Sequence, residues 1–136
     1  MSSDLIKGAE ELLAQCSHVT LVSVDSEGFP RPVPMAKGHT SGCNEVWMAT
    51  GADSLKVAEF RQNPKAGLCY DHGGASVCLR GTVEIVTDDT IRSAMWQDWY
   101  INHFTEGPTD PNYLLLHFVG TEATIWLNNR FAHLPL

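Results

Sequence analysis

The spacing of apolar residues changes several times near the N-terminus, and each change predicts a new element. Apolar residues recur at helical spacing over residues 4–16, which predicts a short amphipathic helix. β-Branched residues dominate 18–25 and predict a strand, followed by a tight turn that contains Gly28. Two further strands are predicted at 29–39 and 44–50.

The rest of the chain continues with short strands separated by tight turns and helices. A helix over 54–62 is predicted to end at Asn63, because the residue before a proline disfavours helical geometry. A second helix begins after Asp88 and is predicted to extend through the aromatic residues as far as Tyr100. The remaining predicted strands occupy 65–71, 76–87, 113–119, 123–127 and 130–134.

The strand at 29–39 carries prolines at alternate positions, namely Pro30, Pro32 and Pro34. Since backbone N–H groups alternate in direction along a strand, the three missing N–H groups lie on one side. Such a strand can pair through its other side only, so we expect it at an edge.

The order of the predicted elements is helix, three strands, helix, two strands, helix and final strands. This order lacks the regular alternation of strand and helix that builds a parallel sheet. A chain of 136 residues is the length of one domain. We therefore predict a single, mainly β domain (α+β by content), a six-stranded antiparallel barrel with flanking helices.

Composition and charge exclude several classes of function. The chain has nine basic and 16 acidic residues and a net charge of −7, which disfavours a nucleic-acid partner. Its apolar runs are too short to span a membrane, and residues 1–7 show no secretory leader, so a cytoplasmic protein is expected. Six of the nine basic residues lie in 31–80, which suits one small anionic ligand held locally.

The four cysteines are Cys16, Cys43, Cys69 and Cys78, and none forms a Cys-x-x-Cys pair. We interpret them as free thiols. A metal site that joins Cys69, His72 and Cys78 lacks a fourth ligand and matches no zinc spacing, so no metal is expected.

The most informative segment for chemistry is 49–56, where a buried strand ends at Thr50 and a helix begins near Ser54. A helix N-terminus offers free N–H groups and partial positive charge, and Lys56 adds a cation in its first turn. Thr50, Ser54 and Lys56, here called the hydroxyl–lysine cluster, would therefore hold a phosphate. The alternative is that Asp53 or Ser54 simply caps the helix and Lys56 is solvated.

Several segments, taken in order and spacing, resemble the FMN-binding split-barrel proteins related to pyridoxamine 5′-phosphate oxidase. Among these, the chain is most similar to the small bacterial general stress proteins. The resemblance covers nearly the whole chain and implies a single FMN-binding split-barrel domain of Greek-key type over 1–136. The segments that carry it are 20–24, 28–35, 47–56, 63–68, 79–81, 95–96 and 107–113.

The resemblance also implies which residues contact the cofactor. Arg31 and the hydroxyl–lysine cluster take the phosphate, and Pro32, Val33 and Pro34 lie along the flavin ring. Ser76 stands where a glutamine usually touches the flavin, and Trp126 and Trp96 are candidate ring contacts from the partner subunit. The sequence departs from the oxidase pattern at Ala36, Ala49, Leu55 and Ser76, which would weaken FMN binding or change the flavin accepted.

The function implied is that of a flavin-dependent oxidoreductase of unknown substrate, with unidentified catalytic residues. We expect a homodimer with FMN or FAD at the interface and NAD(P)H or another small redox partner. Oxidation of pyridoxamine phosphate is not expected, because Arg130 and His133 do not have the spacing of the oxidase's C-terminal element. The alternatives are a non-catalytic flavin-binding or flavin-buffering stress protein, and a dimer that binds haem, a deazaflavin or no cofactor.

Overall fold

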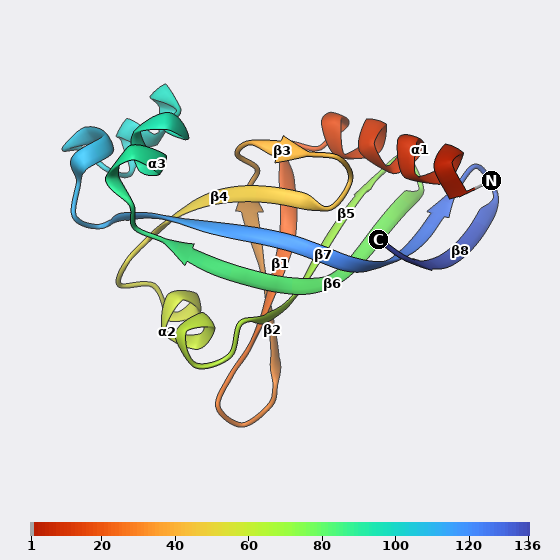
Figure 1. Cartoon of the computed structure of the whole chain (residues 1–136), viewed down its shortest axis with the longest axis horizontal. Coiled ribbons are helices and arrows are strands. Elements are labelled where there is room, and N and C mark those ends of the chain that lie inside the picture. The colour runs from red at the N-terminus through yellow and green to blue at the C-terminus, as the bar shows by residue number, and fades with distance from the viewer. Residues whose placement is uncertain (1) are drawn as a thin grey trace.

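The computed structural model describes residues 2–136, and antiparallel strands account for most of them (Figure 1). The α-helices are α1 (Ser2–Gln15), α2 (Leu55–Gln62) and α3 (Asp89–Ala94), and the short 3-10 helices are η1 (Asp98–Asn102) and η2 (Gly107–Thr109). The strands are β1 (His18–Val24), β2 (Pro30–Ala36), β3 (Thr40–Ser41), β4 (Glu45–Gly51), β5 (Lys65–His72), β6 (Ala75–Val86), β7 (Tyr113–Leu127) and β8 (Arg130–Pro135).

The strands follow the order β2-β1-β5-β6-β7-β4-β3, with β8 paired to β7, and every pairing is antiparallel. Two backbone hydrogen bonds join the segment after β2 to β4: Gly38 N–H donates to the Trp47 carbonyl at 2.9 Å, and Trp47 N–H donates to the His39 carbonyl at 2.8 Å. These bonds bring the ends of a six-strand path together, which confirms the split barrel. The sheet has eight strands rather than the six predicted, because two further strands lie outside this path: the short β3 pairs with β4, and β8 pairs with β7.

The last long strand is continuous, whereas the sequence predicted separate strands at 113–119 and 123–127. The register of β6 against β7 shifts between Arg80 and Gly81. Because a bulge absorbs this shift, β7 continues through residues 120–122, where the sequence predicted a break. A Cβ on Gly81 would lie 2.0 Å from the Val119 carbonyl oxygen, so the backbones approach too closely there for any side chain.

Two other predicted boundaries were wrong. The helix expected to run from Asp88 to Tyr100 ends at Ala94 and is followed by η1. Tyr100 belongs to a separate small core with Phe104 and Tyr113, and packing into that core takes precedence over a straight helix. The strand expected to end at His39 ends at Ala36, because the residues beyond it pair with β4 instead of β1.

The edge position of β2 is confirmed. In the antiparallel register of the two strands, Pro30, Pro32 and Pro34 lie opposite Val24, Val22 and Thr20 of β1. No strand pairs with the other side of β2 over Pro30–Ala36 within the described chain. The missing proline N–H groups therefore cost the sheet no hydrogen bonds.

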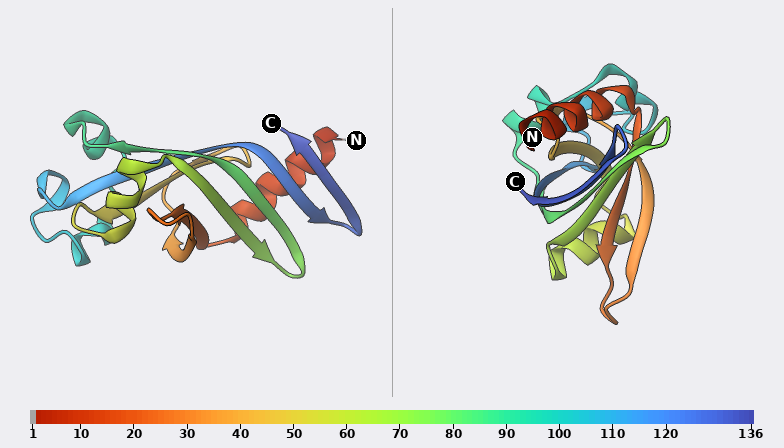
Figure 2. Two further views of the ribbon diagram at one scale, coloured as in Figure 1. Left: turned by 90° about the horizontal axis from the view of Figure 1, so that it is seen from below. Right: turned by 90° about the vertical axis from the view of Figure 1, so that its right-hand side faces the viewer.

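The main core fills the barrel, and α1 covers it by packing against β5, β6 and β7 through its buried side chains. A second, smaller core lies under α3 and η1. The helices over the two cores lie at opposite ends of the long axis of the molecule, with α1 beside β8 and α3 at the far end (Figures 1 and 2). The barrel therefore has one end bordered by aromatic residues and one by α1.

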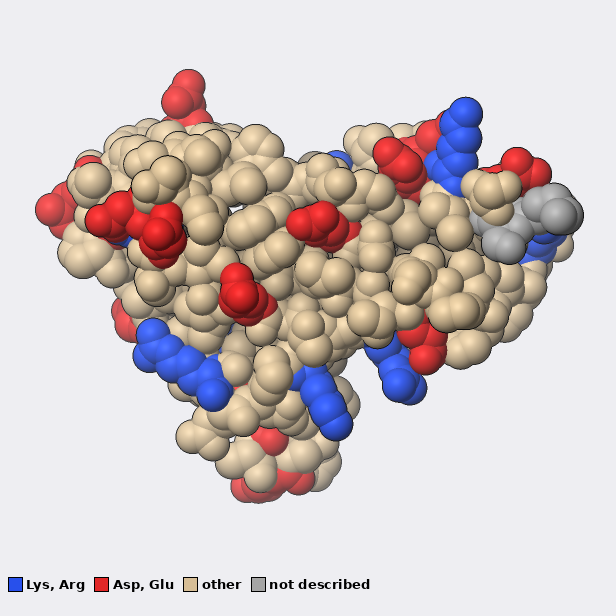
Figure 3. Space-filling view, in the orientation of Figure 1, with Lys and Arg blue, Asp and Glu red and all other residues tan. Residues whose placement is uncertain are grey.

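Acidic side chains gather at the end that carries α3 and at the tip of the β1–β2 hairpin, Lys and Arg lie along the edge near α2 and β6, and both charges occur at the end that carries α1 (Figure 3). No helix in residues 2–136 has the length and hydropathy needed to cross a membrane.

The Gly81 contact gives a prediction about stability. Gly81→Ala should lower the free energy of unfolding by about 1–3 kcal/mol, because the new methyl group displaces backbone at the bulge. Gly67→Ala, on the neighbouring strand, is the matched control, since its Cβ would come no closer than 3.4 Å to Val22. Urea unfolding of the two variants measures the difference, and equal losses would show that the close approach at the bulge is unimportant.

Candidate functional site

The hydroxyl–lysine cluster is assembled as the sequence predicted. Lys56 Nζ donates a hydrogen bond to Thr50 Oγ1 at 3.1 Å, and the Thr50 and Ser54 hydroxyl oxygens are 3.4 Å apart. Thr50 is nearly buried near the end of β4, and Lys56 lies in the first turn of α2. The turn between the two elements therefore brings two hydroxyls and an ammonium group together at a helix N-terminus.

Ser54 occupies the N-cap position of α2, but its side chain makes no capping hydrogen bond. Its hydroxyl lies beside Thr50 instead. The simple capping interpretation therefore fails for this side chain, and the first N–H groups of α2 lack a side-chain acceptor from Ser54.

Lys56 is a half-buried cation with no acidic partner. Burial lowers the pKa of the Lys56 ammonium group. Among residues 2–136, no carboxylate lies within ion-pair distance of its Nζ. The cluster thus combines donors and positive charge and has no negative charge of its own.

A cleft of about 480 Å³ opens beside the cluster. One side is formed by β2 at Pro34–Ala36, and the polar end by Ala49–Gly51 together with Lys56. The facing side carries Trp99, Tyr100, His103, Phe104 and Asn112. The cleft therefore has a cationic, hydroxyl-bearing end and an aromatic wall.

None of the residues of this wall was predicted from the sequence to lie in the site. Burial raises the pKa of the Tyr100 hydroxyl, so it stays protonated at neutral pH. The signal in the sequence was the run of aromatic residues that ends at Tyr100, which was predicted to continue the helix that begins after Asp88. The break after Ala94 turns part of that segment toward β2.

Arg31 does not line the cleft. Its Nε forms an ion pair with Glu59 Oε2 at 2.8 Å, and Ser23 Oγ donates to Glu59 Oε1 at 2.8 Å. Glu59 is only 8% exposed, so Arg31 and Ser23 supply the partners that its buried carboxylate requires. The ion pair ties β2 to α2 and uses Nε, which leaves the two terminal nitrogens outside it; a role in binding phosphate stays a prediction.

Ser76 and Trp126 lie far from the cleft within one chain. They face each other across β6 and β7, while Gly51, beside the cleft, faces Tyr113 at the other end of β7. The strand length between Tyr113 and Trp126 corresponds to roughly 40 Å. Pro34 lines the cleft, whereas Pro32 and Val33 precede it on β2.

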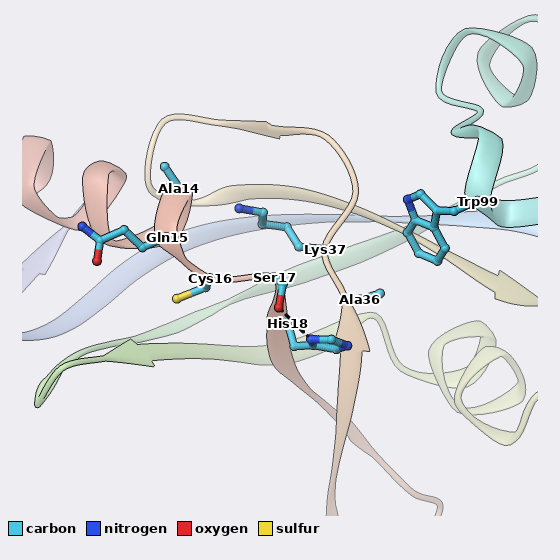
Figure 4. A pocket seen from close by; sticks show the side chains of 8 residues that line it. All are labelled: Ala14, Gln15, Cys16, Ser17, His18, Ala36, Lys37 and Trp99. Carbon is cyan, nitrogen blue, oxygen red and sulfur yellow. Dashed lines mark hydrogen bonds between the residues drawn. The ribbon is translucent and has the colours of Figure 1, made fainter.

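A second hollow, of about 520 Å³, adjoins the cleft and shares Ala36 and Trp99 with it (Figure 4). Trp99 extends from η1 toward the strand that carries Ala36, and Cys16 and Lys37 lie on the side of α1 (Figure 4). Lys37 Nζ donates to the Leu13 carbonyl at 2.7 Å, near the C-terminus of α1. This lysine is therefore engaged by the helix terminus, where a cation is favourable.

Comparison with known proteins identifies relatives of the fold. Residues 4–134 match the family model described as pyridoxamine 5'-phosphate oxidase like. A Clostridium acetobutylicum protein related to general stress protein 26 is 21% identical, with a TM-score of 0.88 over 100% of this chain and 97% of that chain. General stress protein 26 from Bacillus anthracis is 19% identical, with a TM-score of 0.77 over 96% of this chain and 98% of that chain.

A heme binding protein from Mycobacterium smegmatis is also similar, at 14% identity and a TM-score of 0.76 over 96% of this chain and 57% of that chain. No curated protein matches the sequence of this chain. At these identities the solved structures establish the fold alone, while the family model spans nearly all of the sequence. The chain therefore belongs to the pyridoxamine 5'-phosphate oxidase like family.

Proposed function

We propose that this protein binds flavin mononucleotide in the cleft, with the phosphate at the hydroxyl–lysine cluster. The observation that carries the proposal is Lys56, a half-buried cation beside a helix N-terminus with no carboxylate partner among residues 2–136. A phosphate would supply the missing negative charge and accept hydrogen bonds from Thr50, Ser54 and the first N–H groups of α2.

The rest of the cleft suits an aromatic ring system. Its aromatic wall offers stacking or edge contacts to a planar ring, and the unpaired side of β2 exposes the carbonyl oxygen of Pro34. A bound flavin supplies hydride chemistry, and the chain's own residues hold and orient it and exclude water. FAD shares the inner phosphate, so it remains a second candidate cofactor for the same cluster.

The second part of the proposal is a homodimer with the cofactor site at the interface. Trp126 and Phe131 are cross-strand neighbours that are 41% and 71% exposed, an apolar pair of the kind that protein interfaces bury. Ser76 lies opposite Trp126 on the next strand. A second copy that covers this surface would carry Ser76 and Trp126 to the cleft of its partner, which one chain cannot do.

The proposed activity is that of a flavin-dependent oxidoreductase of the general stress type, with NAD(P)H or another small molecule as redox partner. Pyridoxamine phosphate is not the proposed substrate. A flavin-binding or flavin-buffering protein without catalysis is the alternative that shares this site. NAD(P)H-dependent bleaching of the bound flavin distinguishes the enzyme from the buffer.

Haem is a second candidate ligand because His103, an imidazole that can serve as an axial ligand, lines the aromatic side of the cleft. The name of the Mycobacterium smegmatis neighbour points the same way. A Soret band in the purified protein would favour haem over FMN. A colourless protein that binds neither FMN nor haem would support a dimer that holds no cofactor. A bound deazaflavin would be recognised by its own absorption spectrum.

The central prediction concerns affinity for FMN. Lys56→Ala should weaken FMN binding about tenfold to a hundredfold, because a charge-assisted phosphate contact contributes about 1.5–3 kcal/mol. Lys65→Ala is the matched control, since Lys65 is an exposed lysine on β5. Quenching of flavin fluorescence on titration measures both. An absence of binding to the unaltered protein, or equal binding by the two variants, would remove the proposal.

The lowered pKa of Lys56 predicts how that affinity depends on pH. The charged form is the one that binds phosphate, so affinity should fall as pH rises through the depressed pKa, below the ordinary lysine value of about 10.4. Lys56→Arg should abolish this fall, because a guanidinium stays protonated. Riboflavin, which lacks the phosphate, reports any titration of the ring itself; a parallel fall for riboflavin would exclude Lys56 as the cause.

The interface model predicts complementation between two defective variants. Lys56→Ala and Trp126→Ala should each bind FMN weakly, because each damages both sites of a homodimer. Mixing them by joint refolding should restore part of the binding, since a heterodimer contains one site with both native residues. Light scattering confirms the dimer, and a mixture that binds no better than its components would show that the two residues do not share a site across an interface.

A further inference from the structure

Two cysteines outside the cleft face each other across neighbouring strands. Cys69 of β5 is the direct partner of Cys78 of β6 in the antiparallel register. Both are free thiols, as are Cys16 and Cys43. Neither Cys69 nor Cys78 lines the proposed cofactor cleft, so this pair is not accounted for by the proposed function.

The turn that joins the two strands fixes the geometry of the pair. Gly73 and Gly74 form a two-residue connection with φ values of 58° and 86°, so the flanking pair His72 and Ala75 is hydrogen-bonded. Hydrogen-bonded and non-hydrogen-bonded pairs alternate along an antiparallel ladder, so Cys69 and Cys78, three pairs further on, form a non-hydrogen-bonded pair.

A non-hydrogen-bonded pair has the closer side chains. Its Cα atoms are about 4.5 Å apart, and a disulfide needs a separation of about 4.4–6.8 Å. The buried neighbours Leu68 and Tyr70 point into the barrel, so Cys69 and Cys78 share the outer face. A bond between the two sulfurs would therefore require little movement of the backbone.

The surroundings of the two thiols differ. Cys78 is exposed, whereas Cys69 is only partly exposed. Burial, together with a hydrogen bond to Cys78, raises the pKa of the Cys69 thiol to about 12. Cys69 thus keeps its proton at neutral pH, and Cys78 is the sulfur that solvent and solutes reach.

We propose that Cys69 and Cys78 form a hydroperoxide-sensitive thiol pair that oxidises reversibly to an intramolecular disulfide. The Cys78 thiol gives up its proton and its sulfur attacks a peroxide oxygen. The O–O bond breaks, Cys78 becomes a sulfenic acid, and the leaving oxygen takes up that proton and departs as water or an alcohol. Cys69 sulfur then attacks the Cys78 sulfur, the S–S bond forms, and the sulfenic oxygen leaves as water with the Cys69 proton. Two thiols are oxidised and one hydroperoxide is reduced.

A metal site is the alternative role for Cys69 and Cys78, and the geometry favours the disulfide. No group of three or more His, Cys, Asp or Glu side chains in the described part of the chain is arranged to hold a metal ion. The proposal needs no flavin, but it needs Cys78 to stay exposed. Because Cys78 lies two residues from Ser76 on the outer face of β6, the proposal also requires that the homodimer interface leave this part of the face open. The disulfide would cross-link the hairpin just beyond its turn and record exposure to peroxide.

The test treats the reduced full-length protein with hydrogen peroxide and follows intact mass, free thiols and cross-linked peptides. The unaltered protein should lose two hydrogen atoms and two titratable thiols, yield a peptide pair that joins Cys69 to Cys78, and recover fully with dithiothreitol. Cys69→Ser should instead gain oxygen at Cys78, because the resolving thiol is missing. Cys78→Ser should remain reduced at the same dose.

Cys16→Ser is the matched control, since Cys16 is buried and its removal should leave formation of the disulfide unchanged. Three results would overturn the proposal: an unaltered protein that keeps all its thiols, one that gains oxygen at Cys78 as Cys69→Ser does, or one that cross-links only between chains. Each result is read from the same mass spectrum, and none depends on the presence of a cofactor.

Discussion

The cleft depends on the contact between Gly38 and Trp47, which closes the barrel. A Cβ on Gly38 would lie 2.5 Å from the Trp47 carbonyl oxygen and 2.9 Å from the Tyr100 hydroxyl, so glycine alone lets the two backbones meet. The hydrogen bonds formed there hold the end of β2 against β4. Without that closure, Pro34–Ala36 and Thr50 would border separate surfaces and no shared cleft would exist.

Trp47 is in turn fixed by its neighbours. Its indole stacks on the His117 ring, with centroids 3.9 Å apart, and His117 Nε2 is 2.7 Å from Glu45 Oε2. The aromatic wall is held from the other side by Arg92, whose Nη1 donates to the carbonyls of Asp110 and Tyr113 at 3.0 and 2.8 Å. Stacking and hydrogen bonds therefore fix the elements on both sides of the cleft, an arrangement that favours preorganisation of its lining.

The sequence predicted the barrel because its signals are local. The prolines of β2 specify an edge, and the two-residue turn at Gly73 specifies a hairpin. The hydroxyl–lysine cluster was predictable for the same reason, since Thr50, Ser54 and Lys56 lie within one turn and one helix start. The aromatic wall and the Arg31–Glu59 ion pair could not be predicted from the sequence, because both depend on which distant elements pack together.

The two cations next to α2 show how stability and function separate in this structure. Arg31 faces Glu59, and the pair satisfies a buried carboxylate, so its removal would leave an uncompensated charge in the fold. Lys56, on the same helix as Glu59, has only a hydroxyl partner and bears the desolvation cost that lowers its pKa. An anionic ligand bound as proposed would offset that cost and would stabilise the folded state by mass action.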